Sequence, residues 1–189
     1  SRAVLKGKMG DFQSAEEDFK KAQELNDKNT YIALAWADME LRRKNFDRAQ
    51  EIIDDIRRRE ARERFVKLPD HILQNILGKI EAVRFNYDLE KANNRWRRRY
   101  KTSIEKSSNN PITYNNFAQI EILAGEIDEA EKLLKKSLDC DPKNAYTYKI
   151  YGEMLSKIPE QQEEAKKYLS EKNPNTKIRN PKQIQKTKQ

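Results

Sequence analysis

Apolar residues recur along most of the chain at the spacing of one face of an α-helix. After Gly10, the residues Phe12, Ala15, Phe19 and Ala22 follow one another at steps of 3, 4 and 3, and this periodicity predicts a helix. The same pattern predicts further helices over residues 31–41, 46–62, 69–83, 87–104, 114–123, 127–138, 148–155 and 160–171. Polar or proline-containing breaks separate these segments, so the expected fold is all-α.

The pattern also repeats itself at a fixed interval. Phe12 aligns with Phe46 when the chain is shifted by 34 residues, and Asn110 aligns with Asn144 at the same shift. A fixed period of this length is typical of helical-repeat arrays, in which each helix pair buries its apolar stripe only by stacking on the next pair. We therefore expect an α-solenoid of about four antiparallel helix pairs.

The segment from Asn110 to Asn144 resembles the tetratricopeptide repeat. Its motif residues are Tyr114, Phe117, Ala118, the run Gly125-Glu126-Ile127-Asp128-Glu129-Ala130 and Asp141-Pro142. Ala118, Ala130 and Ser137 fall where this family has small residues, because its two helix backbones approach closely there. The resemblance implies a right-handed superhelix over residues 1–170, with units at about 1–29, 30–63, 64–109, 110–144 and 145–170.

Two units depart from that pattern. Trp36-Ala37-Asp38-Met39-Glu40 with Arg48-Ala49 also resembles the half-a-tetratricopeptide variant of RNA-processing scaffolds. The unit 64–109 is irregular, because Ala49 and Ala130 are 81 residues apart. Long helices are the simplest account of this extra length.

The two ends of the chain carry further expectations. Residues 171–189 hold six Lys or Arg and one Glu, and few large apolar residues, so we expect a flexible basic tail. The first helix of the first unit is short by about five residues, which suggests a piece of a larger protein. Such a unit would expose Leu5, Phe12 and Phe19 to another copy, so self-association is an open alternative.

Composition limits the class of protein. The chain is 36% hydrophobic and 37% charged, which suits a thin array of surface-rich helices. No apolar run approaches the roughly 18 residues that span a bilayer, and Cys140 is the one cysteine, which excludes an internal disulfide. We expect no membrane contact and a cytoplasmic, intracellular location.

Residues that carry chemistry are sparse. His71 is the one histidine, and Cys140 occupies an apolar helix position suited to packing. The sequence has no metal-ligand cluster, phosphate-binding glycine loop or dinucleotide motif. We therefore expect no enzyme and no cofactor, and nominate no catalytic, cofactor-binding or metal-binding residue.

In the family that this chain resembles, the first helix of each pair lines a concave groove that binds a peptide or helix of a partner protein. The groove residues implied here are Leu34, Asp38, Arg42, Asn115, Asn116, Gln119, Ile122, Tyr146, Lys149, Glu153 and Lys157. The two-carboxylate clamp of the chaperone-binding members is not reproduced. The expected function is a non-catalytic interaction scaffold within a larger intracellular protein.

The charge of the chain supports an alternative function, the binding of nucleic acid. Lys and Arg exceed Asp and Glu by 8. Two arginine runs, Arg57-Arg58-Arg59 and Arg95-Trp96-Arg97-Arg98-Arg99, lie within the predicted helices. A basic platform for RNA or DNA would use Arg57, Arg58, Arg97, Arg98 and Lys101. Trp96 and Tyr100, however, share a helical face with Ala92 and are expected in the core. A further alternative is the sensor or regulatory arm of a multidomain signalling protein.

Overall fold

The computed structural model describes residues 2–27, 29–60 and 68–172, and all regular structure in these ranges is helical. The chain divides into two compact units, one up to Lys106 and one from Ser107 onward. In the first unit the helices are α1 (Arg2–Lys8), α2 (Phe12–Leu25), α3 (Thr30–Arg42), α4 (Phe46–Glu60), α5 (Asp70–Arg84) and α6 (Arg95–Lys106). The second contains α7 (Pro111–Ala124), α8 (Ile127–Cys140), α9 (Ala145–Leu155), the 3₁₀ turn η1 (Pro159–Gln161), α10 (Gln162–Lys166) and the π-helical turn η2 (Lys167–Lys172).

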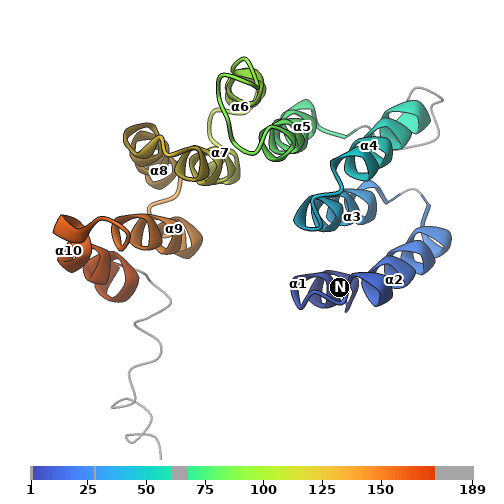
Figure 1. The fold of residues 1–189 in the computed structure, drawn as a ribbon, viewed down its shortest axis with the longest axis horizontal. Coiled ribbons are helices and arrows are strands. Elements are labelled where there is room, and N and C mark those ends of the chain that lie inside the picture. Colours follow the sequence, from blue (N-terminus) through green and yellow to red (C-terminus); the bar gives the residue numbers. More distant parts are fainter. Residues whose placement is uncertain (1, 28, 61–67, 173–189) are drawn as a thin grey trace, which may run out of the picture. The chain divides into compact units, whose positions relative to one another are not determined.

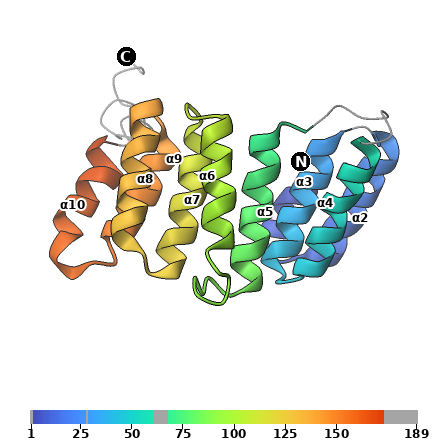
Figure 2. The same cartoon turned by 90° about the horizontal axis from the view of Figure 1, so that it is seen from above.

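Within each unit, consecutive helices pack as antiparallel pairs (Figures 1 and 2). The pairs are α1–α2, α3–α4 and α5–α6 in the first unit, and α7–α8 and α9 with α10–η2 in the second. We call the earlier member of each pair its A helix and the later one its B helix. The all-α prediction is confirmed, and the expected flexible tail lies outside the described residues apart from positions 171 and 172.

Small residues lie where the helices of a pair touch. On the A helices these are Ala3, Ala37, Ala118 and Gly152, and on the B helices Ala15, Ala49 and Ala130; all are buried. At Gly152 the approach is so close that an added Cβ would lie 2.5 Å from Cγ of Leu169. The small residues of the repeat are therefore buried in the helix pairs, and at Gly152 the two helices are in close contact.

Helix caps and glycine turns recur at the ends of the A helices. Asn29, Asn110 and Asn144 cap α3, α7 and α9, each side-chain oxygen accepting a hydrogen bond from a backbone N–H of the first turn. After α1 and α7 the chain turns through Gly10 and Gly125 with φ of 86° and 83°. These caps and turns set the ends of the A helices at the same repeat positions.

The third pair differs from the prediction. Its extra length is not in long helices, since α5 has 15 residues and α6 has 12. Part of it lies in the α5–α6 connection, residues 85–94, which includes four residues with positive φ: Asn86, Tyr87, Asn93 and Asn94. The predicted helix over 87–104 therefore begins only at Arg95, because this looped backbone cannot continue as a helix.

Arginine side chains also link neighbouring pairs of the first unit. The guanidinium of Arg43, after α3, lies 5.6 Å from the ring centroid of Phe12 on α2. In the next pair Arg84 of α5 lies 5.8 Å from the ring centroid of Phe46 on α4. Phe12 and Phe46 are equivalent repeat positions, so the same cation–π contact joins two successive junctions.

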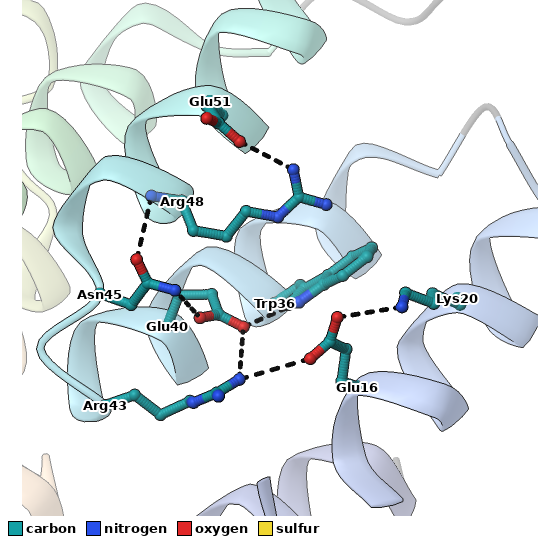
Figure 3. Close-up of polar contacts among 8 residues, drawn as sticks. All are labelled: Glu16, Lys20, Trp36, Glu40, Arg43, Asn45, Arg48 and Glu51. Carbon is teal, nitrogen blue, oxygen red and sulfur yellow. Dashed lines mark hydrogen bonds and ion pairs between the residues drawn. The ribbon is translucent and has the colours of Figure 1, made fainter. Parts of the chain in front are cut away.

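A buried carboxylate organises the junction of α2, α3 and α4 (Figure 3). Glu40 is 1% exposed and accepts hydrogen bonds from the Trp36 indole (3.2 Å) and the Asn45 amide (3.0 Å). The Arg43 guanidinium lies 3.4 Å from Glu40 and also 3.4 Å from Glu16 on α2. The three partners compensate the desolvation of this carboxylate, so Glu40 has a structural role.

The face expected to support self-association is mostly covered. Phe19 is buried and stacks on Trp36, with the ring planes 3° apart. Phe12 is half-buried beneath Arg43, and only Leu5 is largely exposed. The expectation that Leu5, Phe12 and Phe19 form one exposed stripe is therefore wrong, because Trp36 covers Phe19 and Arg43 lies over Phe12.

The turn after each A helix gives a test of backbone strain. Gly125→Ala should lower the free energy of unfolding by about 1–2 kcal/mol, because an alanine Cβ disfavours the left-handed conformation, and no side chain crowds the site. Lys44 occupies the equivalent turn with φ of 59°, so Lys44→Gly should raise the urea midpoint or leave it unchanged. Urea unfolding followed by far-UV circular dichroism measures both. A neutral Gly125→Ala would contradict this account.

Candidate partner-binding face

One repeat position is exposed and apolar in three A helices. Tyr31 on α3, Ile112 on α7 and Tyr146 on α9 are separated by 81 and 34 residues, and are 65%, 62% and 50% exposed. Large apolar side chains at equivalent positions thus stay out of the core. The groove prediction contained Tyr146 but neither Tyr31 nor Ile112, which share its repeat position.

On α7, Ile112 is the first of four residues that form a line along one side of the helix. Ile112, Asn116, Gln119 and Leu123 follow at steps of 4, 3 and 4, which places them on one side of the helix. Ile112 and Leu123, at the two ends, are 62% and 55% exposed, and the two amide residues between them are half-buried. The line is therefore apolar at its ends and polar in its middle.

A second line of exposed residues, on α9, lies beside it. Tyr146, Lys149 and Glu153 are all exposed, and the Lys149 ammonium lies 3.7 Å from the Glu153 carboxylate. The Gln119 amide on α7 donates a 3.0 Å hydrogen bond to the Tyr146 hydroxyl, which joins the two lines. We call these seven residues of α7 and α9 the α7–α9 face: Ile112, Asn116, Gln119, Leu123, Tyr146, Lys149 and Glu153.

Two predicted groove residues of α7 do not belong to this face. Asn115 is 1% exposed, and its amide donates a 2.9 Å hydrogen bond to the Thr147 hydroxyl of α9. That hydroxyl is also 2.9 Å from the Ser137 hydroxyl of α8. Asn115 therefore joins three helices in the interior, and its prediction as a groove residue is wrong. Ile122 is half-buried, while Lys157 is exposed beyond the end of α9.

In the first unit the predicted residues lie on α3 but are largely engaged within the fold. Leu34 is half-buried and packs against the core. Asp38 forms an ion pair with Lys79 of α5 and accepts a 3.1 Å hydrogen bond from the exposed Arg42. This part of the α3 surface is therefore occupied by an intramolecular ion-pair network.

The arginine runs are placed as the helical spacing predicts. Trp96 and Tyr100 are fully buried in the α5–α6 pair, which confirms their assignment to the core and leaves no exposed ring of theirs to stack on a base. Arg98 and Lys101 are exposed and Arg97 is half-buried. Arg57 and Arg58 are exposed near the end of α4.

The described ranges contain no candidate metal site. No group of three or more His, Cys, Asp or Glu residues there could hold a metal ion. Burial raises the pKa of the Cys140 thiol, which lowers the fraction of the nucleophilic thiolate. No helix among the described residues is long and apolar enough to cross a membrane.

Comparisons with known proteins agree with this architecture. Two family models, both described as tetratricopeptide repeat, match residues 8–68 and 112–144. The chain is a tetratricopeptide repeat protein. The first match includes the segment around Trp36 that also resembles the half-a-tetratricopeptide variant. The exposed residues Tyr31 and Ile112 lie within the first and second match, respectively. Proteins of this family are interaction scaffolds built from stacked helix pairs.

A solved structure has a similar fold. The protein reported as "Crystal structure of MamA" matches with a TM-score of 0.51 and 18% sequence identity, and the match covers 98% of each chain. The predicted fold class, a solenoid of antiparallel helix pairs, is thereby confirmed. A comparison with curated proteins gives no match.

The ion pair between α3 and α5 predicts a pH dependence. Burial raises the pKa of the Asp38 carboxyl, but Lys79 and Arg42 outweigh it and hold that pKa below its ordinary value. The stabilisation is therefore present above the unfolded pKa, about 3.9, and is lost as pH falls through the folded pKa. Lys79→Met should raise the Asp38 pKa in an NMR carboxyl titration.

Lys20→Met is the matched control, because the Lys20 ammonium pairs with Glu16 (3.0 Å) rather than Asp38. It should leave the Asp38 pKa unchanged. An Asp38 pKa that is the same in Lys79→Met as in the parent chain would refute the ion-pair assignment.

Proposed function

We propose that the α7–α9 face binds a short segment of a partner protein, and that the chain acts as a non-catalytic scaffold through this face. The observation that carries the proposal is the line of exposed side chains on α7 and α9, in a family whose stacked helices form interaction surfaces. Tyr146 and Lys149 come from the groove prediction, whereas Ile112 and Leu123 are added by the structure.

The apolar members supply the affinity in this proposal. Ile112, Leu123 and Tyr146 are each at least half exposed, so a partner that covers them removes apolar surface from water at a gain of about 25 cal/mol per Å². Tyrosine is also enriched among the residues whose truncation weakens interfaces most. The partner segment should therefore carry apolar side chains that pack on both ends of the α7 line.

The polar members supply orientation. The amides of Asn116 and Gln119 each offer donors and an acceptor, which suits hydrogen bonds to the backbone of a bound peptide. Lys149 and Glu153 compensate each other's charge at 3.7 Å, so the face is close to neutral. Binding should depend little on salt, in contrast to a surface that binds a nucleic-acid backbone.

Peptides selected from a random library on the full chain test this proposal. Tyr146→Ala and Leu123→Ala should each weaken the selected peptides about tenfold, which corresponds to about 1.4 kcal/mol per truncated side chain. Tyr31→Ala is the matched control, because Tyr31 is the same residue type at the same repeat position in the other unit and is similarly exposed. It should leave the affinity unchanged.

Selected peptides whose affinity is unaffected by both variants in the second unit would overturn the proposal. Thermal unfolding of each variant checks that its fold is intact. Because both truncated side chains are exposed, their unfolding midpoints should match that of the parent chain.

A further inference from the structure

The α5–α6 pair carries a hollow of about 450 Å³ that shares no residue with the α7–α9 face. Its lining residues are Gln74, Glu81, Arg95, Arg98, Arg99 and Thr102. The three arginines are at positions i, i+3 and i+4 of α6, which brings their side chains to one side of the helix. Half of the lining residues are therefore permanently cationic.

The positive charge of this hollow is only partly compensated. Its one carboxylate, Glu81, lies 3.4 Å from the Arg99 guanidinium, and Arg99 also donates to the Gln74 side chain at 3.2 Å. Arg95 lies over the Phe85 ring at 5.7 Å. The Arg98 side chain is exposed and forms no hydrogen bond or ion pair with the described residues. The guanidinium donors of Arg95 and Arg98 thus remain for a ligand.

Two electrostatic effects oppose this arrangement of arginines. The first turn of α6 contains Arg95, Arg97 and Arg98 and no acidic residue, although the positive end of the helix dipole disfavours cations there. The three guanidinium groups also repel one another across the hollow. An anion bound among them would relieve both effects.

We propose that this hollow binds a phosphorylated side chain of a partner polypeptide. Guanidinium groups match the oxygens of a phosphate with paired, charge-assisted hydrogen bonds, and the Thr102 hydroxyl adds a further donor. Arg99, held by Glu81 and Gln74, fixes one side of the site, while Arg95 and Arg98 close on the phosphate. This proposal does not rest on the function of the α7–α9 face.

The neighbouring aromatic residues favour a peptide over a nucleic acid. Proteins that bind single strands stack bases on exposed rings, but Trp96 and Tyr100 are fully buried and Arg95 covers Phe85. A volume of about 450 Å³ is within the range of pockets that hold small ligands, and accommodates one phosphorylated side chain. The site is compact rather than an extended basic stripe.

The test uses the full chain and three fluorescent probes in phosphate-free buffer. They are a degenerate alanine-rich peptide with a central phosphoserine, the same peptide with serine, and a single-stranded oligonucleotide. The phosphoserine peptide should bind at least about tenfold more tightly than the serine peptide. Arg98→Gln and the double variant Arg95→Gln with Arg98→Gln should each remove most of that difference.

Arg57→Gln with Arg58→Gln is the matched control, because it removes the same charge from two exposed arginines on another helix. It should change the phosphopeptide affinity by less than about twofold. An equal loss in the control, or equal binding of the phosphoserine and serine peptides, would overturn the proposal. Tighter binding of the oligonucleotide, abolished by the α6 variants, would assign the hollow to nucleic acid instead.

Discussion

The close approach of two helix backbones within each pair is the contact on which the rest of this structure depends. Small buried residues such as Ala37, Ala49, Ala118 and Ala130 permit it, and in the third pair an added Cβ on Gly78 would lie 2.9 Å from Cε2 of Tyr100. Where the A helix has Gly152, Leu169 occupies the space that a side chain would need. The recurrence of small residues at 34-residue intervals in the sequence reflects these helix contacts.

Packing at these contacts determines which side of each A helix remains for binding. An A helix packs against its own B helix and against neighbouring pairs, so one narrow line of side chains is left exposed. On α7 and α9 that line holds Ile112, Leu123 and Tyr146, and the Gln119–Tyr146 hydrogen bond joins the two helices at its centre. The same geometry explains the interior role of Asn115, since it lies one residue before Asn116 on α7 and turns toward Thr147.

The sequence was sufficient to predict the helix pairs, their small contact residues and the buried positions of Trp96 and Tyr100, because each follows from periodicity. It was insufficient for the third pair. The 81-residue spacing fits long helices and long connections equally well, and only the left-handed residues Asn86, Tyr87, Asn93 and Asn94 decide for a connection. Nor could periodicity separate Asn115 from Asn116, because a polar side chain that bonds inside the fold has the same spacing as one that faces solvent.

Chemical-shift mapping is the most direct test of the central claim, that a partner segment binds the α7–α9 face. The full chain is labelled with ¹⁵N and titrated with a peptide selected on it, and the side-chain amides of Asn116 and Gln119 are followed together with the backbone amides of α7, α8 and α9. The account predicts the largest shifts at those two side chains and at Tyr146 and Lys149, and small shifts along α8. Shifts centred on α8, with Asn116 and Gln119 unchanged, would contradict it.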